Sequence, residues 1–427
     1  METTGAAGLS RRSVLKGALA ASTLAALAPT LASCGRSDSP RPLHLGSRNS
    51  DSKAKAGMAA LVGAFTERTS IPVSVNVVDT VSFQENLNNY LQGAPDDVFT
   101  WMSGYRMRYI ANKKLVSPLD AVWPAIDRGF DSSFKGAATD NGHAYLVPLT
   151  YYPWAIYYRK SVWQRYGYQP PRTHADFIDL CKRMKADGIV PLGFAARQGW
   201  TTFGMFDYLN LRINGPDFHR SLLAGEISWT DNRVYATFDA WREFLPFQQE
   251  QPLGRTIAEA HTALLNRKVG MMVTGLFVSE QFPAGPDLDD LDFCPFPEFD
   301  SAIGAGAVEA PLDGLMMSAN PRNREAATQF LEYAASAEAG IKYSSGLAMS
   351  IPAHKDISLA DYSPLIQKAA ALVKNSNSIT QFLDRDTRPD FSSIVIIPSL
   401  QQFIRAPQDL RSVLASIEKQ KKAVFDR

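Results

Sequence analysis

The sequence has few of the side chains on which metal binding and catalysis depend. Its 427 residues include three cysteines and six histidines. No two histidines have metal-ligand spacing, and there is no CxxC pair. The chain also lacks the GxxxxGK[ST], HExxH and GxSxG motifs. We therefore expect no metal, no cofactor and none of these common catalytic centres. An enzyme that uses two carboxylates stays open, because such residues can be far apart in sequence.

The chain has no excess of either charge. Lys and Arg total 44, against 43 for Asp and Glu, which gives a formal net charge of +1. This balance offers no electrostatic basis for binding nucleic acid. At 45% hydrophobic and 20% charged residues, the composition is that of a folded protein rather than a disordered one. At roughly 150 residues per domain, the length predicts two or three domains.

A long hydrophobic run is missing too, and the longest apolar stretch lies at the N-terminus. Arg11 and Arg12 precede an uncharged, Ala- and Leu-rich run over 17–31. This run is shorter than the ~20 residues that a membrane span needs. A positive region, a short apolar region and small residues before a cleavage point are typical of a signal peptide, which we expect over 1–33. The paired arginines resemble a twin-arginine signal, although a general secretory signal can also contain such a pair.

The residues at the cleavage point predict a lipid anchor. Leu31-Ala32-Ser33-Cys34 resembles a lipobox, in which the cysteine after the cleaved bond receives a diacylglycerol group. An ordinary cleavage site beside an incidental cysteine is the alternative. With Cys34 lipidated, residues 34–41 form a polar tether. The mature protein is then held at the extracytoplasmic surface of the membrane without spanning it.

The two remaining cysteines have a structural explanation. Cys181 lies with Phe177, Leu180 and Met184 at the i, i+3, i+4, i+7 spacing of one apolar helix face. A buried thiol there behaves as a small hydrophobic side chain. A disulfide between Cys181 and Cys294 is the alternative that an oxidising exterior allows.

Strand-like and helix-like segments alternate along the chain, which predicts α/β layers with parallel strands. The first strands are expected at 43–45, 73–78 and 98–101, and the first helices at 53–65 and 83–91. Thr173 and Asp176 have the spacing of a capping box, which predicts a helix start there.

Aromatic residues are abundant, at 11% of the chain, and several stand beside Gly or Pro or at the ends of strands. Sugars have apolar C–H faces that flat rings can cover and hydroxyl rims that Asp, Asn or Arg can satisfy. Such rings are candidates for a sugar site, and plain core packing is the alternative for each. The candidates are Trp101, Tyr105, Tyr152, Trp154, Trp200 and Phe277.

Four segments, in order, resemble the carbohydrate-binding, maltose-binding-protein-like family of extracellular solute-binding proteins of ABC importers. The first is AYLVPLTYYPWAIYYRKSVWQRYGYQPPRTHADFIDLCKRMKADGIVPLGF, at 144–194. GMMVTGLF (270–277), GLMMSANPRNREAATQFLEYAAS (314–336) and GLAMSIPAHKD (346–356) follow it. The resemblance covers nearly the whole mature chain and corresponds to the lipoprotein form of the family.

The resemblance implies an α/β fold of two lobes, each a mixed sheet flanked by helices, with several hinge crossings and a ligand cleft between the lobes. The expected N-terminal lobe comprises 42–148 and 307–350, and the C-terminal lobe 149–306 and 351–427. Trp101 follows a strand where the family places first-lobe contacts, and Phe277 stands where a stacking Trp is common. Tyr152 and Trp154 lie just past a crossing.

The resemblance also suggests polar contacts to the sugar. Asp207, on the helix that Trp200 begins, could accept hydrogen bonds from hydroxyls. A solvated or helix-pairing role is the alternative. Asp313, near the return crossing, and Arg388 are further candidates. A surface ion-pair cluster explains the 385–390 stretch, which contains Arg388, equally well.

The function implied is extracytoplasmic capture of a sugar or oligosaccharide by a monomer that catalyses no reaction, followed by delivery to the permease of an ABC importer. Permease and ATPase would be separate chains, because this one has no Walker motif or membrane span. A carbohydrate-active lipoprotein enzyme with a carboxylate pair, and an adhesive or structural lipoprotein, are the alternatives.

Overall fold

The structure, a computed structural model, describes residues 41–50, 52–344 and 350–425. The expected signal peptide, Cys34 and nearly all of the tether lie outside these residues, as does the beginning of the 346–356 segment. Among the residues described, no helix combines the length and apolar character required to cross a membrane.

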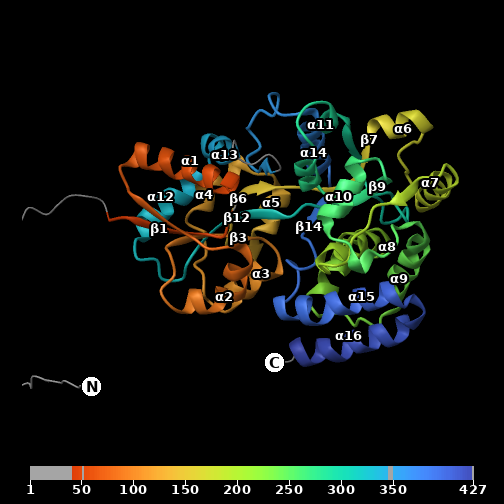
Figure 1. The fold of residues 1–427 in the computed structure, drawn as a ribbon. Helices are drawn as coiled ribbons and strands as arrows, with labels where there is room; N and C mark the ends of the chain where they lie inside the picture. Colours follow the sequence, from red (N-terminus) through yellow and green to blue (C-terminus); the bar gives the residue numbers. More distant parts are fainter. Residues whose placement is uncertain (1–40, 51, 345–349, 426–427) are drawn as a thin grey trace, which may run out of the picture. The chain divides into compact units, whose positions relative to one another are not determined.

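A six-stranded mixed sheet organises the first part of the chain, with strand order β13-β6-β12-β3-β1-β2 (Figure 1). β1 is parallel to both β2 and β3, as the alternating pattern predicts, whereas β12 is antiparallel to β3 and β6. All five residues of β3 are buried, which suits a central strand. The strands are β1 (Leu43–Ser47), β2 (Val73–Val77), β3 (Val98–Met102), β6 (Val147–Tyr151), β12 (Leu312–Met317) and β13 (Ile351–Pro352).

A second, four-stranded sheet has the order β10-β7-β9-β8. Its central strand β7 is antiparallel to β9 and β10 and buried at every position. Its strands are β7 (Trp154–Arg159), β8 (Val190–Leu192), β9 (Val269–Gly275) and β10 (Leu291–Cys294). Two short ladders complete the strands: β4 (Thr139–Asp140) with β5 (His143–Ala144), and β11 (Ala307–Glu309) with β14 (Ser378–Thr380).

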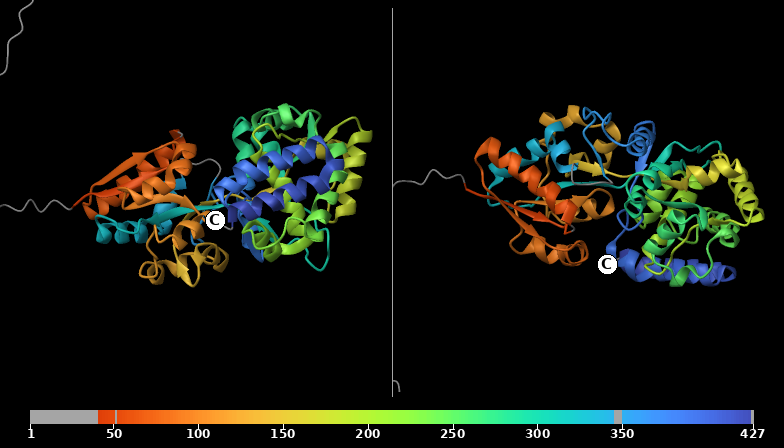
Figure 2. Two further views of the ribbon diagram at one scale, coloured as in Figure 1. Left: turned by 90° about the horizontal axis from the view of Figure 1, so that it is seen from below. Right: turned by 45° about the horizontal axis from the view of Figure 1, so that its top comes forward.

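Helices cover both sheets and divide between two hydrophobic clusters. One cluster contains side chains of the first sheet and others of the second sheet, and α10 and α11 contact strands of the second sheet. Its helices are α1 (Ser52–Thr69), α2 (Thr80–Gln92), α3 (Tyr105–Asn112), α4 (Trp123–Ile126), α5 (Ser132–Ala137), α10 (Ile257–Leu265), α11 (Pro286–Asp290), α12 (Arg324–Ala334), α13 (Ala337–Ser344) and α14 (Pro364–Lys374). Those of the second cluster are α6 (Lys160–Tyr166), α7 (His174–Ala186), α8 (Phe203–Leu223), α9 (Asn232–Phe244), α15 (Ile397–Arg405) and α16 (Leu410–Phe425). α15 and α16 run side by side (Figure 2).

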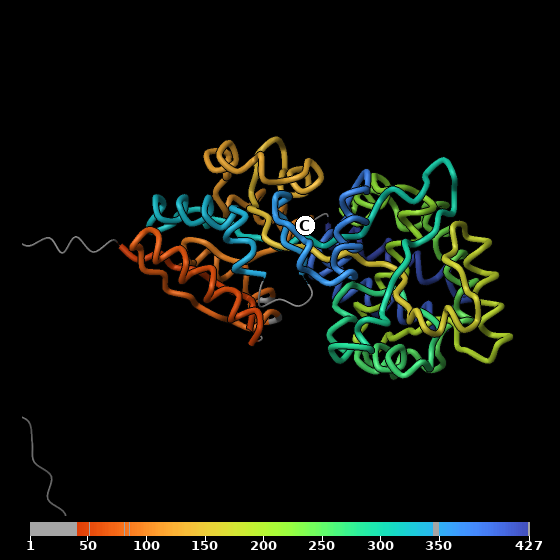
Figure 3. The backbone as a smooth tube through the Cα atoms, turned by 90° about the horizontal axis from the view of Figure 1, so that it is seen from above, coloured from red at the N-terminus to blue at the C-terminus, as the bar shows by residue number. Residues whose placement is uncertain are grey.

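The chain passes between the two sheets three times. It goes from β6 directly into β7, returns from β10 through β11 into β12, and leaves β13 for α14, β14 and α15. Figure 3 shows the yellow and blue segments of the tube making the first and third of these passages. The mixed α/β fold with several crossings agrees with expectation, while the lobe boundaries at 148/149, 306/307 and 350/351 stay a prediction.

α7 confirms two local predictions, and the structure shows that neither cysteine forms a disulfide. The side chain of Thr173 accepts a hydrogen bond from the backbone N–H of Asp176, and the Asp176 carboxylate accepts one from the backbone of Thr173, which completes the capping box. Cys181 is buried on the apolar face of the helix, as predicted. Both Cys181 and Cys294 are free and buried, so the alternative of a disulfide between them is wrong. Each thiol serves as a core side chain.

Candidate functional site

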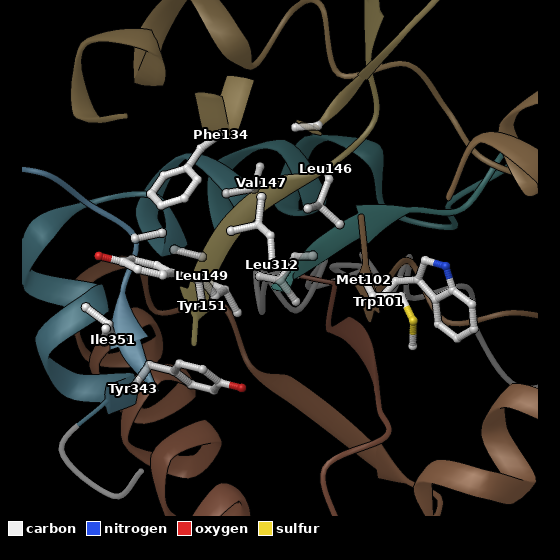
Figure 4. Packing of buried hydrophobic residues seen from close by; sticks show 14 of the residues in the cluster. Trp101, Met102, Phe134, Leu146, Val147, Leu149, Tyr151, Leu312, Tyr343 and Ile351 are labelled. Atoms are coloured by element: carbon white, nitrogen blue, oxygen red, sulfur yellow. The ribbon is translucent and has the colours of Figure 1, made fainter. Parts of the chain in front are cut away.

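A small cavity lies at the carboxyl ends of β1 and β3, the edge where ligands bind in open α/β sheets. Its volume is about 190 Å³. Trp101, near the end of β3, lines it and is 2% exposed. Figure 4 shows the indole ring extending away from the packed side chains of Leu149 and Leu312. The cavity is lined by Arg48, Asn49, Lys53, Ala54, Thr100, Trp101, Leu149, Thr150, Glu280, Asp313, Gly314, Tyr343 and Ser350.

Asp313 is held between two arginines in this cavity. Arg48, directly after β1, donates from Nη2 to Oδ1 of Asp313, and Arg385 donates from Nη1 to the same oxygen at 2.8 Å. Burial alone would raise the pKa of Asp313, but the charges of Arg385 and Arg48 outweigh it and lower the pKa. Asp313 is therefore ionised at neutral pH, and the group of three side chains carries one net positive charge.

Two donors in the cavity have no acceptor. Nε of Arg48 and Nε1 of Trp101 are buried, and neither has a hydrogen-bond partner among the described residues. Buried donors are normally paired, because an unmade hydrogen bond there costs about 1–3 kcal/mol. Arg48 and Trp101, which line the cavity, therefore each retain one buried donor without an acceptor among the described residues.

An aromatic cluster lies beside the start of β7, on the side of the second sheet. Trp154 stacks on Phe382 with ring centroids 4.3 Å apart. Phe277 stands with its ring centroid 5.6 Å from Trp154 and 5.9 Å from Tyr152. The Trp200 ring is 6.3 Å from Phe277 and 6.0 Å from Phe382. Trp154 is buried, whereas the rings of Tyr152, Trp200 and Phe277 keep part of their surface exposed.

Arg385 connects the aromatic cluster to the charged cavity. Its Nη2 donates to the hydroxyl of Tyr152 at 3.1 Å, while its Nη1 holds Asp313. The guanidinium also lies 5.7 Å from the centre of the Tyr152 ring. Burial raises the pKa of Tyr152 to about 12, so its hydroxyl stays protonated. Arg385 therefore links the aromatic cluster to the charged side chains of the cavity.

The structure brings together five of the sequence-predicted aromatic and polar residues here. Trp101 and Asp313 line the cavity, and Tyr152, Trp200 and Phe277 form the exposed part of the cluster. Trp154 belongs to the same cluster but lies behind these rings. Neither this grouping nor the burial of its members tests ligand contact, so their role in binding stays a prediction.

Asp207 is buried, so the solvated alternative is wrong, while a role in binding stays a prediction. It is 0% exposed, and its Oδ2 accepts a hydrogen bond from the backbone N–H of Leu383 at 2.9 Å. Burial raises the pKa of this carboxyl well above its usual range. The residue faces the junction between α8 and the chain segment after β14.

Tyr105 and Arg388 lie together, apart from the aromatic cluster. Tyr105 stacks on Tyr109 at 6.2 Å and meets the Phe425 ring at 6.2 Å. Arg388 lies 5.7 Å from the rings of both Tyr109 and Phe425. Its guanidinium makes two hydrogen bonds to Asp390, at 3.0 and 2.8 Å. This ion pair is the kind of surface cluster that the sequence left open for the 385–390 stretch.

Sequence reasoning missed several residues that line the cavity or join its parts: Arg48, Asn49, Lys53, Glu280, Phe382 and Arg385. One signal was present, because Arg48 directly follows a strand predicted to be parallel. The carboxyl end of such a strand is where ligand contacts collect. No local pattern marks Arg385, which reaches Asp313 from a distant part of the chain.

The sequence model of the bacterial extracellular solute-binding protein family matches residues 49–341. An uncharacterised ABC transporter extracellular-binding protein of Pyrococcus horikoshii is 25% identical over 65% of this chain, and the match spans 63% of that relative's length. A multiple sugar-binding protein of Streptococcus mutans is 32% identical over 18% of each chain.

Solved structures resemble this fold over nearly its whole length. The bacterial solute receptor AcbH, for which an exclusive preference for β-D-galactopyranose is described, is 39% identical with a TM-score of 0.86. That match covers 90% of this chain and all of AcbH (100%). RafE in complex with raffinose has a TM-score of 0.69 at 18% identity, covering 90% of this chain and 99% of RafE. The second likeness concerns the fold alone.

Proposed function

The chain belongs to the bacterial extracellular solute-binding protein family, and we propose that it captures a sugar outside the cytoplasm and delivers it to the permease of an ABC importer. The observation that carries this proposal is the linkage, through Arg385, of partly exposed aromatic rings to the charged side chains of the cavity. Rings cover the C–H faces of a pyranose, while charged and amide groups satisfy its hydroxyls.

The cavity draws residues from both sheets, which supports capture by closure. Glu280, beside Phe277 in the segment after β9, lines the cavity together with Arg48 and Asp313 from the first sheet. A sugar that touches both sides stabilises the arrangement in which they lie close together, by its differential affinity for that arrangement. The permease would then distinguish the loaded protein by its shape.

The size of the cavity favours a small sugar. Its volume of about 190 Å³ is below the ~300–1,000 Å³ of pockets for drug-sized ligands. AcbH, 39% identical to this chain, is described as exclusive for β-D-galactopyranose. D-galactose is therefore the first candidate, although fold alone does not decide a ligand.

A thermal-shift screen tests this proposal directly. D-galactose, its C4 epimer D-glucose, and di- to tetrasaccharides are each added to the purified mature protein. A ligand at 100 times its dissociation constant stabilises the protein by about 2.7 kcal/mol, which raises the melting temperature measurably. We expect a shift with D-galactose, weaker or absent with D-glucose. A panel that produces no shift with any sugar would favour the adhesive or structural alternative.

We propose further that the protein leaves its sugar chemically unchanged and acts without a cofactor. The relatives are receptors, and within the described residues no group of three or more His, Cys, Asp or Glu side chains could hold a metal ion. Prolonged incubation with the sugar that binds best, followed by chromatography, tests the point. Product in excess of the protein would support the carboxylate-pair enzyme.

The lipid anchor is also a proposal, motivated by Leu31-Ala32-Ser33-Cys34 and the short apolar run before it. The monomeric state is a separate proposal. Cys34→Ala should release the protein from membranes, whereas Cys181→Ala, which changes a buried core thiol, should not. A Cys34→Ala protein that still sediments with membranes at high salt would contradict the anchor. Light scattering of the mature protein measures its mass and tests the monomer.

A further inference from the structure

Two buried carboxyl groups lie on elements that pack against each other, α8 and β11, where the chain passes between the sheets. Glu309 ends β11, and Asp207 lies on α8. β11 and β14 form a parallel ladder in which Glu309 is the partner of Thr380. Partner residues in a ladder point to the same face, so the Glu309 and Thr380 side chains emerge together. Both β11 and β14 belong to the segments that connect the two sheets.

Glu309 is buried, and no hydrogen bond stabilises its charge among the described residues. Its exposure is 0%, and neither carboxyl oxygen has a hydrogen-bond partner among the described residues. The hydroxyl of Thr380 is likewise buried and unpartnered. An isolated ionised carboxylate in such a place costs far more than a neutral carboxylic acid, so the group takes up a proton instead.

Asp207 has better support for a negative charge. Its Oδ2 accepts the Leu383 N–H. Its Oδ1 has no hydrogen-bond partner among the described residues, and Nε2 of His219 lies 3.9 Å from it. Nδ1 of His219 lies 2.9 Å from Nδ2 of Asn210. Because an amide nitrogen can only donate, Nδ1 is the acceptor, and a neutral His219 carries its proton on Nε2, the side of Asp207.

The cations of α8 do not neutralise the pair. Arg212 is buried, and its guanidinium donates to the backbone carbonyls of Phe296 and Ala307. Arg220 pairs with Asp217 at 2.6 Å. The hydroxyl of Tyr208 donates to the carbonyl of Trp154 and so provides no charge.

The segment after β14 supplies further charges near the pair: Asp384 raises the pKa of both carboxyl groups, and Arg385 lowers that of Glu309. Nη1 of Arg385 donates a hydrogen bond to Asp313, and Nη2 of Arg108 forms an ion pair with Oδ1 of Asp386 at 3.1 Å. Asp384 lies 3.9 Å from Arg106. Burial raises the pKa of both Glu309 and Asp207 well above the usual range, and the charge of Asp207 raises that of Glu309 further.

We propose that Asp207 and Glu309 carry one proton between them at neutral pH, that Glu309 holds it, and that the neutral carboxyl keeps the β11–β14 ladder packed on α8. A second negative charge would place two like charges on side chains that are both fully buried. The proton lies on a segment that connects the two sheets. β11 continues towards Asp313, and β14 towards Arg385, the two residues that pair in the candidate site.

The proton makes folding depend on pH in a definite direction. In the unfolded chain, Glu309 ionises near its ordinary pKa of about 4.3, whereas in the native protein it stays neutral. A group whose pKa is raised by folding contributes its full stability below its unfolded pKa and loses that contribution as pH rises. Each pH unit above about 5 should cost the wild type about tenfold in its folding equilibrium constant at this site.

The test compares Glu309→Gln with the wild type by denaturant unfolding between pH 5 and pH 8. Gln keeps the shape and needs no proton. The folding equilibrium constant of Glu309→Gln, divided by that of the wild type, should therefore rise about tenfold per pH unit over this range until the native pKa is reached. The matched control is Glu67→Gln, on the exposed surface of α1, for which the ratio should stay flat.

Infrared spectroscopy provides an independent measurement on the folded, sugar-free protein. A protonated carboxyl has a C=O band, shifted in D₂O, that an ionised one lacks. We expect this band in the native wild type at pH 8, its loss on unfolding, and its absence from Glu309→Gln. If the variant fails to fold, the band of the native wild type at pH 8 and its loss on unfolding are sufficient to test the proposal. A missing band in the wild type, a flat ratio, or a band that persists in Glu309→Gln, as a protonated Asp207 would give, overturns the proposal. Since no sugar is present, these outcomes are independent of the proposed transport function.

Discussion

Replacing Trp154 with alanine should damage folding rather than binding alone. The ring is 2% exposed and stacks on Phe382 at a centroid distance of 4.3 Å. It also meets Phe277 at 5.6 Å and packs so closely against Gly204 of α8 that a side chain there would collide with it. Cutting a buried Trp to Ala costs about 3–5 kcal/mol. The close packing of α8 leaves little room for the neighbours to collapse into the space, so we expect the upper half of this range.

Trp200 offers the matched comparison, because it belongs to the same cluster but keeps part of its ring exposed. The centroid of its ring lies 6.3 Å from that of Phe277 and 6.0 Å from that of Phe382. Both distances exceed the 4.3 Å between the stacked rings of Trp154 and Phe382. Trp200→Ala should therefore cost clearly less stability than Trp154→Ala. Loss of its contact with the sugar should weaken binding tenfold or more, about 1.4 kcal/mol.

Urea unfolding of the sugar-free proteins measures the first quantity, and calorimetric titration with the sugar that binds best measures the second. The two variants should differ in opposite ways: Trp154→Ala mainly in the unfolding midpoint, Trp200→Ala mainly in the dissociation constant. If Trp200→Ala binds as tightly as the wild type while unfolding as easily as Trp154→Ala, the ring is core packing and the aromatic-cleft argument fails.

Three further predictions follow from individual contacts. Asp313→Asn should weaken sugar binding at least tenfold by calorimetry. Because the pKa of Asp313 is lowered, the wild type should lose this carboxylate's contribution to stability only as pH falls below about 4. The Asn variant should not show this loss. If the stability of both proteins falls in the same way with pH, the arginine pairing is refuted. Cys181 and Cys294 should resist a thiol reagent until denaturant is added, and rapid labelling of the native protein would contradict their burial. Thr173→Ala should lower the unfolding free energy by about 0.5–2 kcal/mol, whereas the conservative Thr173→Ser should change it little.

The local patterns of the sequence predicted the parts of this protein that depend on neighbours along the chain. The spacing of Phe177, Leu180, Cys181 and Met184 identified the buried face of α7, and Thr173 with Asp176 identified its first turn. β1, β2 and β3 lie where the apolar runs placed them. Helix caps and amphipathic faces are set by residues within one or two turns, so one sequence contains what is needed to find them.

The same patterns could not separate aromatic residues that look alike along the chain. Trp154 and Trp200 both stand near Gly or Pro, yet the structure buries one and leaves the other partly exposed. A solvated Asp207 was one alternative from its position on a helix, but the residue is buried and accepts a hydrogen bond from the backbone of Leu383. Burial depends on which distant segments pack on a side chain, and no local spacing records that.

By itself, the sequence determined an α/β chain with helix faces, caps and strands in definable places, and its ordered segments indicated the family. Tertiary structure alone decided that Arg48, Asp313 and Arg385 form one charged group, and that Glu309 and Asp207 are both fully buried on elements that pack against each other. These groupings join residues separated by up to 337 positions, because the chain crosses three times between its sheets. Their chemistry arises from desolvation and from charge pairing at short range. Both effects exist only once the crossings have brought the segments together.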